Sequence, residues 1–342
     1  MSRPFSSRKL LAPLTPAYRL AVWLRAMRLK AGFEPVRHLR SPVVSIGNLS
    51  TGGTGKTPLT IALAQALKKR GFHVDVLSRG YGREGKGAAR VDPGGSAEQF
   101  GDEPLLIARE AGVPVYVARQ RYEAGVLAEA DRRASHADGS AKPAVHLLDD
   151  GFQHSQLARD VDVVLLNRED WQGRLLPAGN LREPLKAIHR ADIVALPAED
   201  AALVDELRRS RYEGTIWRLR RTMEIPPLDG PALAFCGIAR PEQFFTGLKA
   251  GGARLSACKA FPDHHRFSER DARQLIAEAK ATGAAALFTT EKDLVRMGRF
   301  AEHFANDLPM QAVSLRIAIE QEDEKLDAVI HRLMSASAKP SL

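Results

Sequence analysis

One stretch near the N-terminus, residues 43–58 (VVSIGNLSTGGTGKTP), limits what this chain can fold into more than any other feature. Its apolar start predicts a buried strand, its glycines predict a tight turn, and Pro58 lies where the first turn of a helix tolerates a missing N–H group. In such a unit the N–H groups of the turn and the helix N-terminus bind phosphate. We expect Lys56 to reach the β- and γ-phosphates of a nucleotide and the Thr57 hydroxyl to bind Mg²⁺.

This loop departs at one position from the strict P-loop pattern G-x-x-x-x-G-K-[ST], which has glycine where Ser50 stands. The flanking strand and helix nevertheless favour nucleotide binding over a chance glycine-rich turn. The residues predicted to contact the nucleotide are Ser50, Thr51, Gly52, Gly53, Thr54, Gly55, Lys56 and Thr57.

Short apolar runs alternate with helical patterns after this loop. The runs predict buried strands at 43–46, 74–77, 113–117, 145–148, 161–166 and 193–196. Helical periodicity separates several of them, at 59–70, 103–111 and 122–133. The alternation is typical of an α/β fold, here a P-loop NTPase-like parallel sheet with helices on both faces.

The composition changes at residues 226–231 (PPLDGP), where three prolines and a glycine fall within six residues. Strand-like and helical runs beyond this break predict a smaller C-terminal α/β domain, with strands at 232–236, 285–289 and 310–315 and helices at 241–250 and 269–282. Stretches 85–101 and 135–143 are expected to be surface loops. The expected division is a basic amphipathic arm (1–40), a P-loop nucleotide-binding domain (41–226), the C-terminal domain (227–334) and a tail (335–342).

Positive charge is concentrated in the first 40 residues. They hold nine Lys and Arg against one acid, Glu34, whereas the whole 342-residue chain carries a net charge of +9. Residues 18–32 predict a helix whose apolar stripe is flanked by Arg and Lys and consists of Leu20, Trp23, Leu24, Met27 and Ala31. Such a helix suits either an anionic membrane surface or docking on its own domain. RNA-binding signatures are absent, which argues against a nucleic-acid partner.

Several protein classes are disfavoured by what the sequence lacks. Two cysteines, Cys236 and Cys258, are too few for a disulfide framework or a thiolate zinc site and fit a reducing compartment. The first residues do not resemble a signal peptide, and no apolar run is long enough to span a bilayer. These features favour a cytoplasmic protein.

Two carboxylates follow another predicted strand, in the segment 145–154 (VHLLDDGFQH). Acidic residues at a strand end beside a P-loop are suited to hold Mg²⁺, because hard cations prefer oxygen ligands. We therefore expect Asp149 and Asp150 to lie on the metal side of the site. Gln153 and His154 are then expected close to the transferring phosphate.

Further polar clusters lie at strand ends, where open α/β sheets bind ligands. They are SRGYG at 78–82, GDEP at 101–104, LLPAGNLREP at 175–184 and FPDHHRF at 261–267. Each alone is equally compatible with turn or capping chemistry, and the adjacent acid and imidazoles at 263–265 favour acid–base use or substrate positioning over zinc. The side chains expected to bind substrate are Arg79, Tyr81, Gln153, His154, Asn180 and Arg182.

Taken together, these motifs resemble the tetraacyldisaccharide 4′-kinase family of lipid A biosynthesis. The resemblance includes all of these segments and TTEKD at 289–293, runs from about residue 42 to 296, and makes Ser50 part of the family pattern. It implies transfer of the γ-phosphate of ATP, with Mg²⁺, to the 4′-hydroxyl of a tetraacylated glucosamine disaccharide 1-phosphate. It also implies a peripheral position on the cytoplasmic face of a bacterial inner membrane. The anionic membrane surface as a partner is inferred only from the charge and periodicity of the first 40 residues, and no protein partner is implied.

The resemblance further implies roles for individual residues. Asp102 and His264 are expected to form the base for the sugar hydroxyl, although spacing alone does not separate His264 from His265. Glu183 joins Asp149 and Asp150 as an expected metal-side carboxylate.

Two other functions remain compatible with a P-loop. The segment 167–170 (NRED) follows a predicted strand and mimics the guanine-reading N-K-x-D, which would fit a membrane-associated GTPase-like switch. A nucleotide-gated binding protein without kinase activity is the second alternative. Formation of ADP only in the presence of a lipid acceptor would distinguish a kinase from both.

Overall fold

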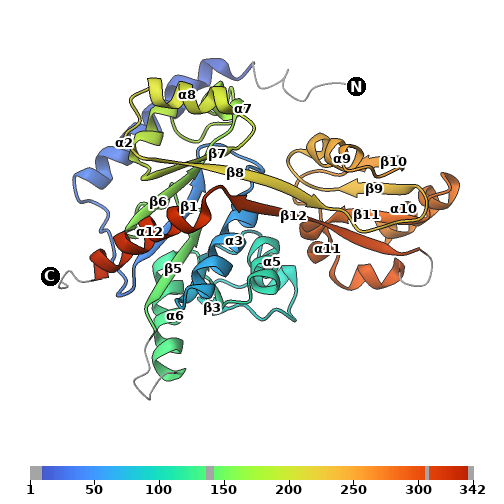
Figure 1. Ribbon diagram of the computed structural model, residues 1–342, viewed down its shortest axis with the longest axis horizontal. Coiled ribbons are helices and arrows are strands. Elements are labelled where there is room, and N and C mark those ends of the chain that lie inside the picture. The colour runs from blue at the N-terminus through green and yellow to red at the C-terminus, as the bar shows by residue number, and fades with distance from the viewer. Residues whose placement is uncertain (1–9, 136–141, 305–307, 338–342) are drawn as a thin grey trace.

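The computed structural model describes residues 10–135, 142–304 and 308–337. These residues form a single sheet with the strand order β10-β9-β11-β12-β8-β7-β6-β1-β5-β2-β4-β3 (Figure 1). The strands are β1 (Val43–Asn48), β2 (His73–Ser78), β3 (Ala89–Arg90), β4 (Val115–Val117), β5 (Ala144–Asp149), β6 (Val161–Leu165), β7 (Ile193–Pro197), β8 (Thr215–Glu224), β9 (Ala232–Cys236), β10 (Leu255–Ala260), β11 (Ala286–Thr290) and β12 (Met310–Ile319). The predicted α/β fold with a large parallel sheet is confirmed.

Helices pack on both faces of this sheet. They are α2 (Thr15–Lys30), α3 (Lys56–Lys69), α4 (Ala97–Phe100), α5 (Asp102–Ala111), α6 (Arg121–Ser135), α7 (Arg168–Trp171), α8 (Ala201–Arg209), α9 (Pro241–Ala250), α10 (Glu269–Ala281), α11 (Glu291–Met297) and α12 (Glu322–Ser337). Short 3₁₀ turns η1 (Ala12–Leu14), η2 (Leu185–Arg190) and η3 (Gly298–Phe304) complete the described elements.

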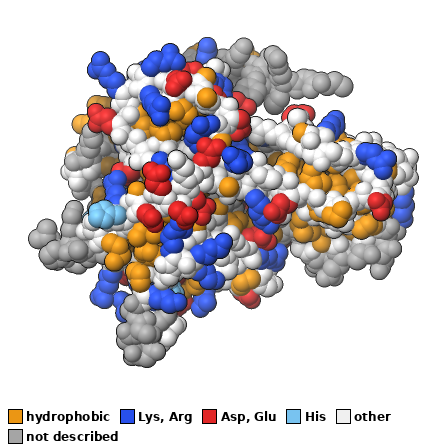
Figure 2. Space-filling view, viewed as in Figure 1, with side chains coloured by type: hydrophobic (Ala, Val, Ile, Leu, Met, Phe, Trp, Pro, Cys, Tyr) orange, Lys and Arg blue, Asp and Glu red, His pale blue; other side chains and the backbone are white. Residues whose placement is uncertain are grey.

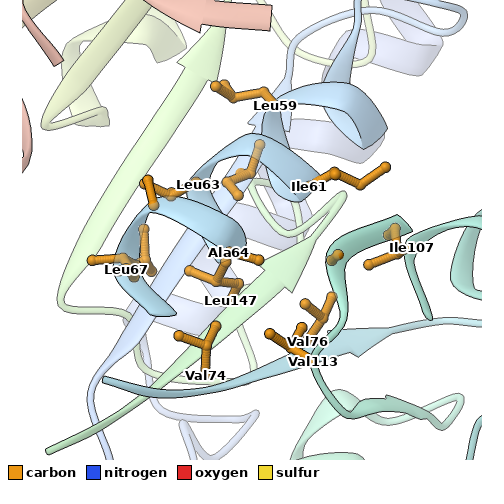
Figure 3. Close-up of a cluster of buried hydrophobic side chains, with 14 of the residues drawn as sticks. Leu59, Ile61, Leu63, Ala64, Leu67, Val74, Val76, Ile107, Val113 and Leu147 are labelled. Carbon is orange, nitrogen blue, oxygen red and sulfur yellow. The ribbon is translucent and has the colours of Figure 1, made fainter. Parts of the chain in front are cut away.

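The first strand, β1, lies at the centre of the parallel region, between β5 and β6. Its apolar side chains are buried on both faces, because Val44 and Ile46 join the cluster under α3 and α5 while Val43 joins the cluster under α6. Figure 3 shows Leu63 and Leu67 of α3 in the first of these clusters, above the side chains of β2 and β5. Burial on both faces explains why these strands read as continuous apolar runs.

Two long antiparallel strands, β8 and β12, run between the parallel region and a second group of elements (Figure 1). We refer to β1–β8 with their helices as the N-terminal part and to β9–β11 with α9–α11 as the C-terminal part. Strand β12 belongs to both, since Met310–Val313 pair with β11 and Ser314–Ile319 pair with β8. Figure 2 shows Lys and Arg intermingled with Asp and Glu on the viewed face, and ion pairs such as Arg316–Glu224 link these two strands.

After β12 the chain returns to the N-terminal part. Leu326, Val329 and Leu333 of α12 are buried in the same cluster as α3, and Arg332 pairs with Asp192 at 2.6 Å. The division at residues 226–227 and 334–335 remains a prediction.

The expected N-terminal helix is present as α2, from Thr15 to Lys30. The predicted apolar stripe faces outward, with Leu20, Trp23, Leu24 and Met27 between 45% and 55% exposed. The opposite face contacts the protein body, where the Tyr18 hydroxyl donates a hydrogen bond to the Arg182 carbonyl at 3.0 Å. Within the described residues, no helix combines the length and the apolar character needed to cross a membrane.

Some sequence-based expectations concern residues that the structure does not describe. The residues outside the described ranges include Arg3, Arg8 and Lys9 of the arm, most of the loop at 135–143 and the end of the tail at 335–342.

The stretch 85–101, which was expected to be a surface loop, contains the short elements β3 and α4. Helix α4 forms there because Ser96 and Gln99 make a capping box at its start.

Candidate active site

A cavity of about 1040 Å³ lies between the P-loop and the C-terminal part. The N-terminal part contributes the P-loop and the strand-end residues Ser78, Arg79, Tyr81, Glu103, Arg121, Asp149, Asp150 and Arg182. The C-terminal part contributes Asp263, His264, Lys292 and Arg296, together with α9 residues such as Phe244. The sheet therefore brings most of the predicted polar clusters to one place.

Several of the contacts that hold the P-loop lie within its own segment. Gly52 and Gly55 have φ angles of 111° and 95°, a backbone that favours glycine, and α3 begins directly after Gly55. The Asn48 amide donates to the hydroxyls of Ser50 at 3.2 Å and Thr54 at 3.0 Å. Ser50 is buried and is not among the residues with a left-handed backbone, so a side chain at this position is tolerated.

Lys56 lies in the loop between an amide and a carboxylate. Its Nζ donates to Asn48 Oδ1 at 3.1 Å and is 3.4 Å from Asp150 Oδ1. These contacts hold the ammonium group at the mouth of the phosphate-binding turn.

The two strand-end aspartates have different environments. Asp149 is buried and accepts one hydrogen bond, from the Ser78 hydroxyl to Oδ2, while its Oδ1 has no hydrogen-bond partner. Burial, with the nearby Glu103 and Asp150 carboxylates, raises the pKa of Asp149 to about 7. Burial also favours a higher pKa for Asp150, but Lys56 and Arg182 outweigh it and lower that pKa. Asp149 is therefore the carboxylate with an oxygen free for a cation.

Asp102 and His264, which are 162 positions apart, are in contact. Asp102 Oδ2 lies 3.1 Å from His264 Nδ1, whereas His265 pairs with Asp271 at 3.2 Å. The hydrogen bond to Asp102 is the main cause that raises the pKa of His264. Burial would raise the pKa of Asp102, but His264, Arg296 and Lys292 outweigh it and hold that pKa well below its usual range. Asp102 thus remains a carboxylate, and its contact stabilises the proton-bound form of the His264 ring relative to a free imidazole.

Several polar residues that line the cavity were not singled out from the sequence, among them Lys292, Glu103, Arg296 and Arg121. Lys292 pairs with Glu103 at 2.5 Å and Arg296 pairs with Asp102 at 2.6 Å, both across the junction between the two parts. Arg121 is buried at the start of α6, and burial lowers its pKa to about 10. Sequence signals existed, since Glu103 follows Asp102 and Lys292 belongs to the TTEKD segment, but no pattern gave them a role.

The expected substrate-binding residues divide into two groups. Arg79, Tyr81 and Arg182 line the cavity, and the Tyr81 ring lies 5.5 Å from that of His264. Gln153 and Asn180 support the P-loop, through a bond from Gln153 Nε2 to the Asn48 carbonyl at 2.8 Å and from the Thr51 amide to the Asn180 carbonyl at 2.8 Å.

The two predicted site residues not yet described are His154 and Glu183. Burial and neighbouring arginines lower the pKa of His154 to about 4, which keeps the ring neutral. Glu183 forms an ion pair with Arg190 at 2.7 Å and is not part of the cavity lining. Within the described residues, Glu183 does not form a metal-binding group with Asp149 and Asp150.

The NRED segment has a local structural role. The Asn167 side chain accepts a hydrogen bond from the Asp170 amide at 2.8 Å and caps α7, while Arg168 pairs with Asp200 and Glu206. The Asn167 and Arg168 side chains therefore bond to other residues of the protein.

Similarity to known proteins extends over almost the whole chain. Residues 7–335 match the family described as LpxK, tetraacyldisaccharide-1-P 4′-kinase. A tetraacyldisaccharide 4′-kinase from Koribacter versatilis is 39% identical over 331 residues, covering 93% of this chain and 97% of the relative. One from Desulfotalea psychrophila is 34% identical, covering 92% and 94%.

A solved structure gives the same result. The crystal structure of LpxK from Aquifex aeolicus in complex with ATP has a TM-score of 0.71 and 32% identity, covering 95% of this chain and 99% of that one. The family match, the relatives and the shared fold agree, and the chain belongs to the tetraacyldisaccharide 4′-kinase family.

Proposed function

We propose that this protein transfers the γ-phosphate of ATP to the 4′-hydroxyl of a tetraacylated glucosamine disaccharide 1-phosphate, a step of lipid A biosynthesis. The observation that carries the proposal is a cavity lined both by the P-loop and by His264, the histidine whose ring is paired with Asp102. A phosphoryl donor and an acceptor hydroxyl can both be bound there. The relatives carry the same activity in their names.

The acceptor hydroxyl is too weak an acid to lose its proton unaided. In the proposed step the sugar oxygen bonds to the γ-phosphorus, the bond to the β–γ bridging oxygen breaks, and ADP leaves with that oxygen. The hydroxyl proton moves to the imidazole of His264. Because Nδ1 faces Asp102, Nε2 is the nitrogen that takes this proton, and the carboxylate stabilises the resulting imidazolium.

Positive side chains supply the charge that the transferring phosphoryl group requires. Lys56 would contact the β- and γ-phosphates, and Arg79, Arg121 and Arg182 line the same cavity. Since Arg182 and Lys56 already neutralise Asp150, we assign this aspartate to holding those cations in place.

Mg²⁺ commonly binds to one or two carboxylates together with phosphate oxygens and water. Within the described residues no group of three or more His, Cys, Asp or Glu side chains could hold a metal ion alone. Asp149 Oδ1, buried and without a partner beside the P-loop, fits a ligand of nucleotide-bound Mg²⁺, and Thr57 is the second. When bound, the ion would neutralise charge on the β- and γ-phosphate oxygens.

We propose that α2 brings the enzyme to the cytoplasmic face of the inner membrane as a peripheral protein. An acylated, anionic sugar remains in the bilayer, so the enzyme has to reach it there. The outward apolar stripe, with Arg19 and Arg28 beside it, suits insertion at an anionic interface, and the opposite face is occupied by the protein body.

The test is a mass-spectrometric assay with ATP, Mg²⁺ and the lipid disaccharide 1-phosphate. We expect one added phosphate on the lipid and equimolar ADP that depends on the lipid. ADP formation without acceptor, and no phosphorylated lipid, would instead indicate a switch or a nucleotide-gated binding protein.

A further inference from the structure

Arg296 of α11 is a buried arginine whose guanidinium contacts two other segments and a residue of its own helix. Its Nε donates to Asp102 Oδ2 at 2.6 Å, and its Nη1 donates to the Gly237 carbonyl at 2.5 Å and to Asp293 Oδ1 at 2.8 Å. The side chain is 7% exposed. A rigid, planar cation with several donors can hold such a set of acceptors, which a lysine cannot.

The Gly237 carbonyl connects this guanidinium to the histidine. The backbone N–H of His264 donates to the same carbonyl at 3.2 Å. His264 has a φ of 57°, a left-handed backbone that a non-glycine residue adopts only when its surroundings hold it there. One guanidinium thus contacts both the carboxylate of Asp102 and the peptide group that anchors His264.

The acceptors are themselves fixed. Asp293 is fully buried and accepts the Gly237 N–H at 3.1 Å and the Thr290 hydroxyl at 2.6 Å. Asp102 Oδ1 accepts the Glu103 amide at 2.9 Å. With Oδ2 shared between Arg296 and His264, both oxygens of Asp102 are engaged inside the protein.

We infer that Arg296 is a positioning residue for the reaction, which sets the distance and orientation between Asp102 of the N-terminal part and His264 of the C-terminal part. This inference rests on the proposed function of that pair. Because both oxygens of Asp102 are engaged, the imidazole is the group that meets the acceptor hydroxyl, and Arg296 acts on the reaction through Asp102.

Arg296 also influences the titration of the imidazole. The groups that face His264 are Asp102 and Asp263, which favour its charged form, Arg296, which disfavours it, and the Tyr81 ring. Loss of the Arg296 charge therefore raises the pKa of His264. Since the neutral imidazole accepts the proton, the acidic limb of the kcat profile moves to higher pH.

The test compares Arg296→Gln and Arg296→Lys with the full-length wild-type enzyme, using ATP and the lipid acceptor. We expect Arg296→Gln to lower kcat by about 10²-fold, the cost of a small misplacement of reacting groups, with little change in KM for ATP. Arg296→Lys, which keeps the charge, should recover part of kcat and keep the acidic limb near its wild-type pH. In an Asp102→Asn background, Arg296→Gln should cost much less, because the two act as a unit.

Arg316→Gln is the matched control, because this arginine also links to α5, at Glu110, but does not contact Asp102 in the structure. It should leave the acidic limb unchanged. The inference is overturned if Arg296→Gln keeps kcat within about threefold of wild type, costs as much in the Asp102→Asn background, or shifts the limb no more than Arg316→Gln. If Arg296→Gln fails to fold by circular dichroism, the same comparisons apply to Arg296→Lys. Failure of the wild-type enzyme to phosphorylate the lipid would refute the proposed function instead.

Discussion

The two sides of the cavity are built in different ways. On one side, residues 48–57 form the P-loop, in which Asn48 bonds to Ser50, Thr54 and Lys56, with added support from Gln153 and Asn180. On the other side, Asp102, Gly237, His264 and Arg296 come from four segments of both parts of the molecule. A site made of one segment depends on local hydrogen bonds, whereas a site made of several depends on how the parts are packed together.

Removal of Lys56 should have the largest effect and tests the single-segment side. We expect Lys56→Ala to lower kcat by at least about 10³-fold, because the phosphoryl group would lose the cation that the P-loop supplies. Lys69→Ala, an exposed lysine at the far end of the same helix, is the control. Retention of a tenth of wild-type activity by Lys56→Ala would contradict the P-loop assignment.

The multi-segment side is tested by Asp102→Ala, His264→Ala and the double variant. Each single change should lower kcat by about 10²- to 10⁴-fold, with little change in KM for ATP, and the double variant should be scarcely worse than the poorer single one. Asp102 raises the pKa of His264, so wild-type activity should be lost as the pH falls through that raised value. In Asp102→Asn the limb should move to lower pH. Additive losses, or an active His264→Ala enzyme, would refute the pair.

On the P-loop side, replacement of Asp149 is expected to lower activity but raise stability. Asp149→Asn should lower activity by at least about tenfold and raise the Mg²⁺ requirement, because a proposed ligand is lost. The same change removes a buried carboxylate with an unpartnered oxygen, so Tm without nucleotide should rise. If Asp149→Asn has the same Mg²⁺ requirement and the same Tm as the wild-type enzyme, the metal binds elsewhere.

The smallest effect on kcat is expected from changes in α2, which belongs to neither side of the cavity. Trp23→Asp with Leu24→Asp should weaken flotation with anionic liposomes, while kcat with detergent-dispersed lipid stays near wild type. Ala21→Asp with Ala26→Asp places the same charges on α2 away from the stripe and is the matched control. Equal flotation of the two double variants would mean that the stripe does not bind the membrane.

The same contrast explains what the sequence could predict. The P-loop and the acids after β5 were recognised from residue order alone, because strand, turn and helix follow one another there. The contact of Asp102 with His264 was expected only through the family resemblance, since nothing local links residues 162 positions apart. Arg296 was missed, because an arginine on a short helix acquires a role only when α11 packs beside α5.

Strands β8 and β12 show a similar limit to what the sequence alone can predict. Residues 215–224 (TIWRLRRTME) alternate between exposed and less exposed positions and carry three arginines, so they did not read as a buried strand, and β12 was expected to end four residues early. Their polar side chains are paired across the two strands, for instance Arg220 with Glu320, which follows the end of β12. Such cross-strand partners become visible only once the register is known.

The return of α12 to the N-terminal part has a consequence for biosynthesis. Leu326, Val329 and Leu333 fill positions in the core beneath α3, so a ribosome has to pass codon 333 before the nucleotide-binding core is complete. The intervening α/β unit can form its own apolar clusters earlier in translation. A nascent chain that is stalled after residue 320 should therefore expose an unfinished core to chaperones, even though every residue of the P-loop has already been made.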